Sequence, residues 1–379
     1  VNAATPMELA PAFTLPGLGP LAARCDELPT DTTHVYKEDV TDAFRHMPLA
    51  NGMVPYFIVA IGPLCFADLR CGFGWSASPA FFSLLSEAVI ALHRPRYPFS
   101  WIYVDDGFGV ERTLSLARSA AAHLRGCITV VAGKKAVATH KSLLNRIVEV
   151  LGITVNVPKQ TLELPPAKQE RLLTALHLFK DGSAESVKDV QSLVGKLRHA
   201  CTCSPALRVA LNVLIDHLLA LQRSTLSGKL SVESRALLAE WWIRTISAGL
   251  EHPFAAFAAP LSVTHVATDA SRTGFGAITD SDPRLLAGVW RESGTSLPHI
   301  NSLEFAVVVA TLDIWPDLLR PRHLTVLHID NTTAISWSRR LRTPAGLPLQ
   351  LALKLAHLLH THKGRVEFRY INTLVNRAD

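Results

Sequence analysis

The stretch Trp101–Val110 (WIYVDDGFGV) decides how the rest of the chain is interpreted. Two runs rich in β-branched and aromatic residues flank Asp-Asp-Gly, which predicts a hairpin with both carboxylates at its tip. Taken alone, Asp-Asp-Gly is most often only a turn, because Asp and Gly tolerate turn dihedrals. A chemical role for this hairpin therefore depends on what accompanies it in the sequence.

A second acidic segment lies upstream, in Val35–Phe44 (VYKEDVTDAF), where Asp39 follows a strand-like run. Neighbouring carboxylates repel each other, and each tends to be neutralised in a dry site. A pair of divalent cations removes that conflict, and two metals ~3.5–4 Å apart can activate a hydroxyl and stabilise a leaving phosphate oxygen. Since Mg²⁺ takes carboxylate and phosphate oxygens, we expect two Mg²⁺ ions per site, or Mn²⁺ in their place.

These segments resemble motifs of the reverse transcriptases. Tyr103–Asp106 looks like the Tyr-x-Asp-Asp signature of that family, and Lys37–Leu49 is similar to its first palm motif. Between them, Cys71–Pro79 (CGFGWSASP) resembles the motif that contacts template and incoming nucleotide. Downstream, Leu151–Val155 resembles the primer-grip strand, and Lys141 falls where the family places a lysine near the triphosphate. With the helices that follow, the resemblance covers about residues 34–222.

The resemblance implies a role for each matched residue. Asp39 and Asp105 would hold both metals with Asp106 supporting them. Phe44 would lie under the sugar and reject a 2′-hydroxyl, and Lys141 would act as a general acid toward the leaving pyrophosphate. The core remains an alternative place for Phe44, and a solvated surface an alternative for Lys141. The other implied positions are Val40 at the metals, Asp42, Ala43, Phe73, Gly74 and Ser78 at the nucleotide (with Phe73 alternatively in the core), and Trp75, Pro79, Tyr103, Leu151 and Gly152 at the nucleic acid.

Residues 166–223 are predicted to form three helices. In the middle one, apolar residues recur at helical spacing from Val187, and Ser186 can cap its start. Gln191–Ala200 (QSLVGKLRHA) resembles the thumb helix of retroelement polymerases. Lys196 and Arg198, with the adjacent His199, would meet the phosphate backbone and give salt-sensitive binding, and a solvated helix face explains them almost as well.

A second set of acids is spread over residues 261–379. The pattern predicts strands at 263–268, 274–279 and 286–290, a helix at 302–315, a strand at 324–329, two helices and a strand at 366–371. Asp269 and Asp330 end two of the strands, Glu304 lies in the first turn of the first helix, and Asp379 closes the sequence. The alternative for Glu304 is an N-cap pair with Asn301, and Asp330-Asn331 is alternatively a helix cap.

The order Asp-Glu-Asp-Asp with this alternation of strands and helices resembles ribonuclease H, and Gly274–Ala277 fits the opening hairpin of that fold. The resemblance implies hydrolysis of the RNA strand of an RNA–DNA hybrid by two Mg²⁺ ions, with the duplex recognised by shape and 2′-hydroxyls. A polymerase that copies RNA into DNA makes that hybrid. The chain thus resembles the reverse transcriptase–ribonuclease H portion of a retrotransposon polyprotein, in style closest to the tyrosine-recombinase (DIRS-type) group.

The expected fold class is α+β, with a right-hand polymerase palm and helical thumb followed by an α/β ribonuclease H-like domain. We expect a loop-rich lead-in with partial fingers at 1–33, palm and fingers at 34–160, the thumb at 161–225, a connector at 226–260 and the ribonuclease H-like domain at 261–379. Expected partners are an RNA template, a DNA primer, the RNA–DNA hybrid, deoxynucleoside triphosphates and other polyprotein domains. The chain is expected to be an excerpt of a longer product, with short fingers and a truncated last helix.

The amino-acid composition argues against several other classes of protein. Of the 379 residues, 48% are hydrophobic and 18% charged, which excludes extensive disorder, and the net charge of +6 permits a polyanionic partner. The uncharged stretch 47–67 is broken by Pro and Gly, so no membrane span is expected. The six cysteines form no CxxC pair and no Cys/His zinc spacing, which favours free thiols inside the cell, in cytoplasm or nucleus.

Two other functions stay open. One is a catalytically inactive, nucleic-acid-binding remnant of a decayed retroelement, against which the intact acids argue. The other is a cellular polymerase–nuclease unrelated to transposition. A recombinase or integrase in the flanking reading frame would exclude the second.

Overall fold

The computed structural model describes residues 10–226, 228–280, 282–290, 297–340, 343–344 and 346–378, together with Asn2, Thr5 and Glu8. The chain divides into two compact units, residues 1–161 and 162–379. This division is coarser than the five segments expected from the sequence, which stay predictions.

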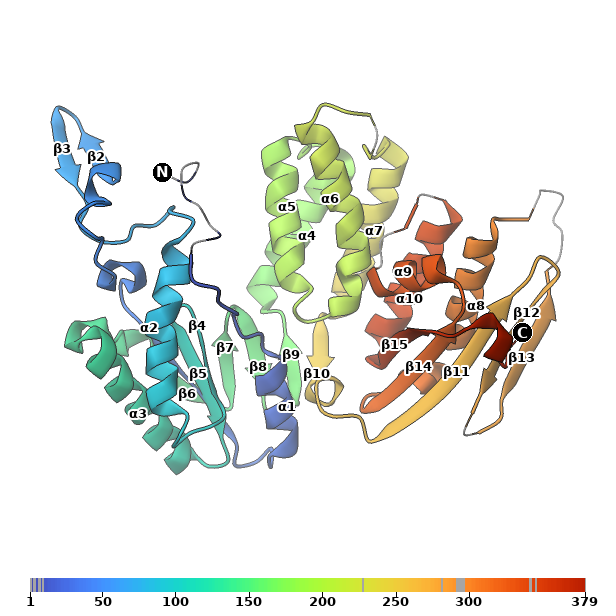
Figure 1. Ribbon diagram of the computed structural model, residues 1–379, viewed down its shortest axis with the longest axis horizontal. Coiled ribbons are helices and arrows are strands. Elements are labelled where there is room, and N and C mark those ends of the chain that lie inside the picture. Colours follow the sequence, from blue (N-terminus) through green and yellow to red (C-terminus); the bar gives the residue numbers. More distant parts are fainter. Residues whose placement is uncertain are drawn as a thin grey trace. The chain divides into compact units, whose positions relative to one another are not determined.

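The first unit is built on a four-stranded antiparallel sheet in the order β4-β5-β1-β6. Helices α2 and α3 pack across one face of this sheet (Figure 1). Thr113 starts α3 by accepting a hydrogen bond from the Leu116 N–H, and its small residues on one face, such as Ala117 and Ala120, allow close packing on β1. The elements are α1 (Gly19–Glu27), β1 (His34–Asp39), α2 (Ser78–His93), β4 (Ser100–Tyr103), β5 (Asp106–Glu111), α3 (Leu114–Ala132) and β6 (Leu143–Asn145).

Two hairpins accompany this sheet in the first unit. Strands β2 (Ile58–Ile61) and β3 (Leu64–Ala67) pair with each other, and all eight of their residues are exposed. Strands β7 (Ile147–Val150) and β8 (Ile153–Asn156) form the other hairpin. The uncharged stretch 47–67 therefore holds a β-hairpin. Among the described helices, none combines the length and the apolarity that crossing a membrane requires.

The second unit begins with helices that match the three predicted at 166–223. The side chain of Ser186 accepts a hydrogen bond from the Asp189 N–H, so the predicted cap of α5 is confirmed. Short strands β9 (Thr161–Glu163) and β10 (Glu251–Pro253) lie side by side at the two ends of the helical run. The helices are α4 (Pro166–Asp181), α5 (Val187–Ala200), α6 (Arg208–Gln222) and α7 (Val232–Ser247).

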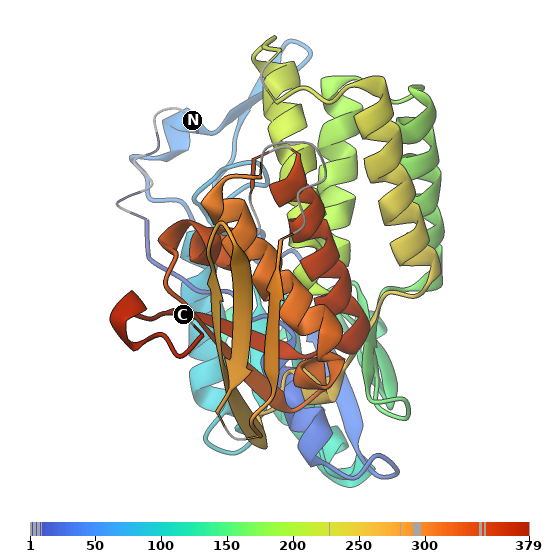
Figure 2. The same ribbon diagram turned by 90° about the vertical axis from the view of Figure 1, so that its right-hand side faces the viewer.

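A five-stranded mixed sheet in the order β13-β12-β11-β14-β15 completes the second unit. Strand β11 is antiparallel to β12 and parallel to β14, and β14 is parallel to β15. The helices lie behind this sheet in Figure 2, and their apolar side chains, including Phe305 and Leu355, form its core. The elements are β11 (Ser262–Ala270), β12 (Gly274–Thr279), β13 (Leu285–Val289), α8 (Ile300–Ile314), β14 (His323–Ile329), α9 (Thr332–Arg340), α10 (Leu347–His362) and β15 (Arg365–Tyr370).

Two candidate active sites

The first acidic set lies where β1 meets the β4–β5 turn. Asp39 ends β1 and pairs in register with Asp106, the first residue of β5. Asp105 precedes it in the turn, and its carbonyl accepts a hydrogen bond of 2.9 Å from the Val40 N–H. Val104, also in the turn, has a φ of 54°, a left-handed backbone that is unfavourable for a β-branched residue. The turn that presents Asp105 is therefore imposed by its surroundings.

Two lysines hold carboxylates of this set. Lys141 Nζ lies 2.8 Å from Asp39 Oδ2, and Lys37 Nζ lies 2.8 Å from Asp106 Oδ1. Burial, and then the nearby Asp39, raises the pKa of Asp105, and burial raises the pKa of Asp106. The hydrogen bond to Asp39 raises the pKa of Lys141, so Lys141 is a protonated partner of the acidic set and not only a solvated surface lysine.

Sequence reasoning missed the residues that brace this set. Glu38 is buried next to Asp39, and its carboxylate accepts hydrogen bonds from Arg125 Nη1 and Ser142 Oγ, both at 2.5 Å. These contacts link β1 to α3 and to the residue after Lys141, so they help to position that lysine. Because the partners are 87 and 104 residues away, no local signal could reveal them. Lys37 could have been found, since it lies two positions before Asp39 on the same face of the strand.

Three aromatic rings lie together beyond the acidic set. Phe44 is half-buried, with its ring centroid 5.2 Å from that of Phe73 and 5.8 Å from that of Phe82. Phe73 is 78% exposed, so the alternative that placed it in the core is wrong. Gly74 follows with a φ of 87°, which favours glycine. The loop thus presents Phe73 outward, as a ligand-facing position requires.

Other residues of this loop hold it in place. Trp75 is only 9% exposed, and its indole N–H donates to Thr5 Oγ1 at 2.9 Å. Ser78 Oγ donates to the Gly72 carbonyl at 2.8 Å. The nucleic-acid contact of Trp75 and the nucleotide contact of Ser78 stay predictions, and the structure gives both side chains a supporting role.

The remaining predicted positions in the first unit lie on turns and element ends. Asp42 is exposed with a φ of 53°, and Ala43 is buried. Tyr103 ends β4, and Pro79 lies in the first turn of α2. Leu151 and Gly152 form the β7–β8 turn, with φ values of 50° and 77°.

In the second unit, α5 turns charged residues outward. Lys196 and Arg198 are exposed, and Lys196 and His199 line a groove of about 440 Å³ between α4 and α5. Lys168 and Arg171 of α4 line the same groove. Sequence reasoning missed these two residues, because only the packing of α4 against α5 brings them beside Lys196 and His199.

The second acidic set converges on one edge of the mixed sheet. Ligand oxygens of Asp269, Glu304 and Asp330 all lie within 4.8 Å of one another. Strands β11 and β14 run parallel with Thr268 opposite Ile329, so the acids that follow them lie side by side. Glu304 reaches them from α8. The convergence expected from strand ends and a helix start is therefore observed for these three residues.

Glu304 is the most perturbed of the three acids. Its Oε1 accepts a hydrogen bond of 3.3 Å from the Ala270 N–H, while its buried Oε2 has no hydrogen-bond partner among the described residues. Burial, with the negative charges of Asp330 and Asp269, raises the pKa of Glu304 to about 8. An oxygen left without a partner in an acidic cluster is suited to a cation.

Of the two helix-cap alternatives, the one for Glu304 is wrong and the one for Asp330-Asn331 is confirmed at Asn331. His299 caps α8 by accepting from the Asn301 N–H, so the alternative that made Asn301 and Glu304 an N-cap pair is wrong. Helix α8 begins earlier than that pairing requires. Asn331 does cap α9, since its Oδ1 accepts from the Ala334 N–H at 2.9 Å.

The C-terminal segment packs against this edge. Thr373 Oγ1 donates to Asp330 Oδ2 at 2.8 Å, and Asn376 Nδ2 donates to the Thr268 carbonyl at 3.1 Å. The Ala378 carbonyl oxygen would be 2.8 Å from a Cβ at Gly276, so a glycine is needed there. Asp379 itself lies outside the described residues, and its predicted place in the acidic set stays a prediction.

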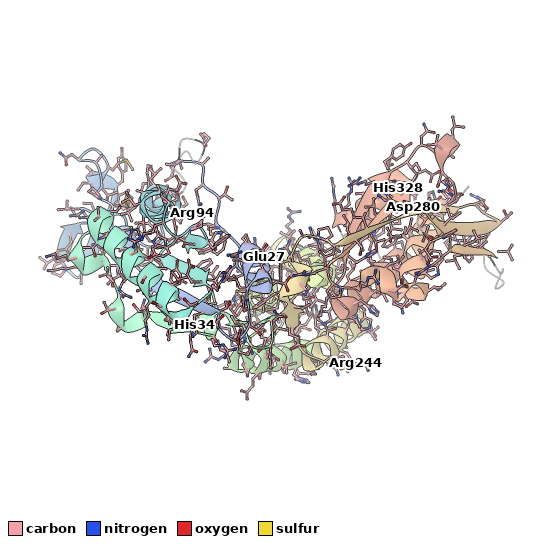
Figure 3. All side chains as sticks on the ribbon, turned by 90° about the horizontal axis from the view of Figure 1, so that it is seen from below. Glu27, His34, Arg94, Arg244, Asp280 and His328 are labelled. Carbon is pink, nitrogen blue, oxygen red and sulfur yellow. The ribbon has the colours of Figure 1, made fainter. Side chains whose placement is uncertain are left out.

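A small cavity of about 290 Å³ lies on the same sheet face as Asp269 and Asp330, because side chains alternate along β11 and β14. His265, His328 and Asp280 line it. Figure 3 shows His328 and Asp280 close together. Arg377 of the C-terminal segment also lines it. This face therefore carries polar groups beyond the acids.

No protein-family model matches the chain, and no curated protein matches it. Solved structures do match it. A foamy viral protease-reverse transcriptase in complex with double-stranded DNA shares 17% identity at a TM-score of 0.50, over 98% of this chain and 61% of that one. The foamy viral enzyme in complex with an RNA/DNA hybrid gives the same identity and TM-score, over 97% and 47%. The chain is therefore similar in its general fold to a reverse transcriptase.

The likeness concerns the fold alone at this identity, and the chain spans about half to three-fifths of those proteins. The predicted α+β class and the general reverse transcriptase architecture are confirmed at that level. The retroelement subgroup is not addressed by it.

The two acidic sets differ in their readiness for a cation. Among the described residues, Asp269, Glu304 and Asp330 form one of two sets of three metal-ligating groups within 4.8 Å, and their oxygen donors fit a hard divalent ion such as Mg²⁺. The set of Asp39, Asp105 and Asp106 does not meet that distance. Two of its carboxylates, those of Asp39 and Asp106, are paired with lysines instead.

Proposed function

We propose that the chain is an RNA-directed DNA polymerase with a ribonuclease H activity, from a retrotransposon. The observation that carries the proposal is that acids remote in sequence converge in each unit, at the ends of neighbouring strands in the first and at the ends of two strands beside a helix in the second. Solved neighbours of the same general fold are complexes with double-stranded DNA and with an RNA/DNA hybrid, which supports nucleic-acid partners.

At the first site, Asp39, Asp105 and Asp106 would hold two Mg²⁺ ions with the Val40 carbonyl. Bound there, the ions would activate the primer 3′-hydroxyl and stabilise the leaving phosphate oxygen. Lys141, whose pKa is raised, stays protonated at neutral pH and can supply a proton to the pyrophosphate. The ring of Phe44 would exclude a 2′-hydroxyl from the sugar position.

At the second site, Asp269, Glu304 and Asp330 would hold two Mg²⁺ ions, with Asp379 as the fourth acid. The buried Glu304 carboxyl must lose its proton to serve as a ligand, so the pH sets how much of the site is ready. Polar side chains on the same face, such as His265 and His328, would border the hybrid.

Two assays on the purified chain test the proposal. Primer extension on an RNA template with Mg²⁺ should incorporate deoxynucleotides, and a labelled RNA strand in an RNA–DNA hybrid should be cleaved. The Asp105→Asn/Asp269→Asn double variant, purified identically, reports contaminating host enzymes. If the wild-type chain is folded and no more active than this variant, the proposal fails.

A second candidate is a nucleic-acid-binding protein without activity. The lysine contacts favour it, because Lys37 and Lys141 neutralise Asp106 and Asp39 without a metal. A folded chain that binds hybrid duplex and shows neither activity would support it.

The finer origin, a tyrosine-recombinase (DIRS-type) retroelement, is part of the proposal and rests on the style of residues 39–49 and 330–337. Sequencing the flanking reading frame tests it: a recombinase would support it, and an integrase would point to another retroelement group.

A further inference from the structure

A cluster of nitrogen and sulfur ligands lies inside the first unit, apart from both acidic sets. His93 is the last residue of α2 and is fully buried, and His123 and Cys127 lie one turn apart on the same face of α3. The ligand atoms of all three lie within 4.8 Å of one another. His123 Nδ1 lies 3.0 Å from His93 Nδ1 and 3.6 Å from Cys127 Sγ.

A chain of hydrogen bonds determines which nitrogen of His93 carries the proton. Ser100 Oγ donates to the Tyr97 carbonyl at 2.8 Å, and a carbonyl can only accept. The Tyr36 hydroxyl therefore donates to Ser100 Oγ at 2.7 Å, and the Tyr36 oxygen accepts from His93 Nε2 at 3.1 Å. With its proton on Nε2, His93 directs the lone pair of Nδ1 at His123.

The distances suit a tetrahedral ion. Zinc binds histidine nitrogen at ~2.0–2.1 Å and thiolate sulfur at ~2.3 Å, which separates two nitrogen ligands by ~3.3 Å and nitrogen from sulfur by ~3.6 Å. The N···S distance already has this value, and the two nitrogens need to part by a few tenths of an ångström. A hydrogen bond on the far nitrogen of a ligating histidine orients its ring, and Tyr36 provides one for His93.

We propose that His93, His123 and Cys127 bind a zinc ion that ties α2 to α3. Two imidazoles and a thiol suit Zn²⁺, whereas Mg²⁺ prefers oxygen ligands, so the site is chemically distinct from the acidic sets. On binding, Cys127 releases its thiol proton to solvent, the His123 proton moves from Nδ1 to Nε2, and a water completes the four ligands. The ion would brace the two helices, and through His93 it would also fix Tyr36, which lies on β1 three residues before Asp39. The spacing of cysteines along the sequence does not reveal this site, because His93 lies on α2 and the other two ligands lie on α3.

The experiment is metal loading of the full chain. After dialysis against Zn²⁺ and removal of free metal, the wild type should retain about one zinc per chain. Substitution by Co²⁺ should give a thiolate-to-cobalt charge-transfer band and tetrahedral d–d bands. Cys127→Ser, which keeps the side chain's size, should abolish the charge-transfer band, and His123→Ala should reduce zinc to background. Cys65→Ser, which removes an exposed thiol outside the cluster, should change neither.

The proposal is overturned if the wild type retains no more zinc than Cys127→Ser and shows no thiolate band with Co²⁺, since the cluster is then only hydrogen-bonded. Near-ultraviolet circular dichroism verifies that each variant is folded. Mg²⁺ bound by carboxylates cannot produce a thiolate band, and neither readout measures polymerase or nuclease activity. Failure here therefore leaves the proposed function standing.

Discussion

At the scale of single residues, Glu304 shows how a site can couple a proton to a cation. It is buried beside Asp269 and Asp330, and its pKa is raised to about 8. Below that pH the carboxyl is protonated, and a divalent cation must displace the proton to use both oxygens. Cation binding at this edge of the sheet should therefore tighten as pH rises.

The same group makes stability depend on pH. The Glu304 pKa is higher in the folded state than its ordinary value of 4.5, so the folded chain binds more protons between about pH 4.5 and 8. The free energy of unfolding in EDTA should fall as pH rises through this window, by up to ~1.4 kcal/mol per pH unit from this group. In urea titrations Glu304→Gln should have a shallower slope than the wild type, whereas Glu87→Gln, at an exposed position on α2, should keep the wild-type slope. A slope in Glu304→Gln equal to that of the wild type would assign the pH dependence to other groups.

Phe44 permits a second test at this scale. Its ring is held against Phe73 and Phe82, so Phe44→Ala should open space without moving the acids. Misincorporation of ribonucleotides should rise by about 10-fold or more relative to deoxynucleotides, as measured by single-nucleotide extension. Phe66→Ala, on the exposed strand β3, should leave sugar selectivity unchanged. The same selectivity in Phe44→Ala as in the wild type would remove Phe44 from its assigned role.

At the scale of elements, α5 has its buried apolar residues on one face and its exposed cations on another. Val190, Leu193 and Leu197 are buried on one face, and Lys196 and Arg198 are exposed on another. The helix is thus held by its apolar stripe. Its two cations are exposed to solvent, and Lys196 lines a groove together with residues of α4.

Substituting these cations should change the salt dependence of binding. Lys196→Ala/Arg198→Ala should weaken binding to hybrid duplex and lower the slope of log K against log salt by about 2, if both meet phosphates. Fluorescence anisotropy over a salt series measures this slope. Arg244→Ala/Lys354→Ala removes two cations that are paired with Glu240 and Asp313, and it should leave the slope nearly unchanged. Equal slopes for both double variants would mean that α5 has only a solvated face.

The elements of residues 166–223 and 261–379 could be predicted closely from the sequence, because local patterns determine them, whereas α1, α2, α3 and the β2–β3 hairpin were not predicted. The strand predicted at 274–279 is observed at those residues, and the helix predicted at 302–315 starts two residues earlier, at Ile300. Because the helix starts earlier, its N-cap is His299, and Glu304 lies with the acidic set instead of in a cap. Contacts between distant segments, such as those of Glu38 and the pairing of His93 with His123, could not be predicted, since no local period encodes them.

At the scale of the whole molecule, each acidic set belongs to one compact unit. Asp39, Asp105 and Asp106 lie in residues 1–161, and the set of Asp269, Glu304 and Asp330 lies in residues 162–379. No described residue contributes to both sets. Loss of one carboxylate should therefore affect one reaction and spare the other.

Two single substitutions test this independence. Asp105→Asn keeps the side chain's shape and the backbone bond to Val40, and it should reduce DNA synthesis by about 10²-fold or more while hybrid cleavage continues. Asp269→Asn should have the opposite effect. Both activities are measured on one preparation of each variant, with primer extension and with a labelled RNA strand in a preformed hybrid. The preformed hybrid matters, because cleavage then does not depend on prior synthesis. If either variant, still folded by circular dichroism, lost both activities, the two acidic sets would have to act as one site, and the division of chemistry between the units would be wrong.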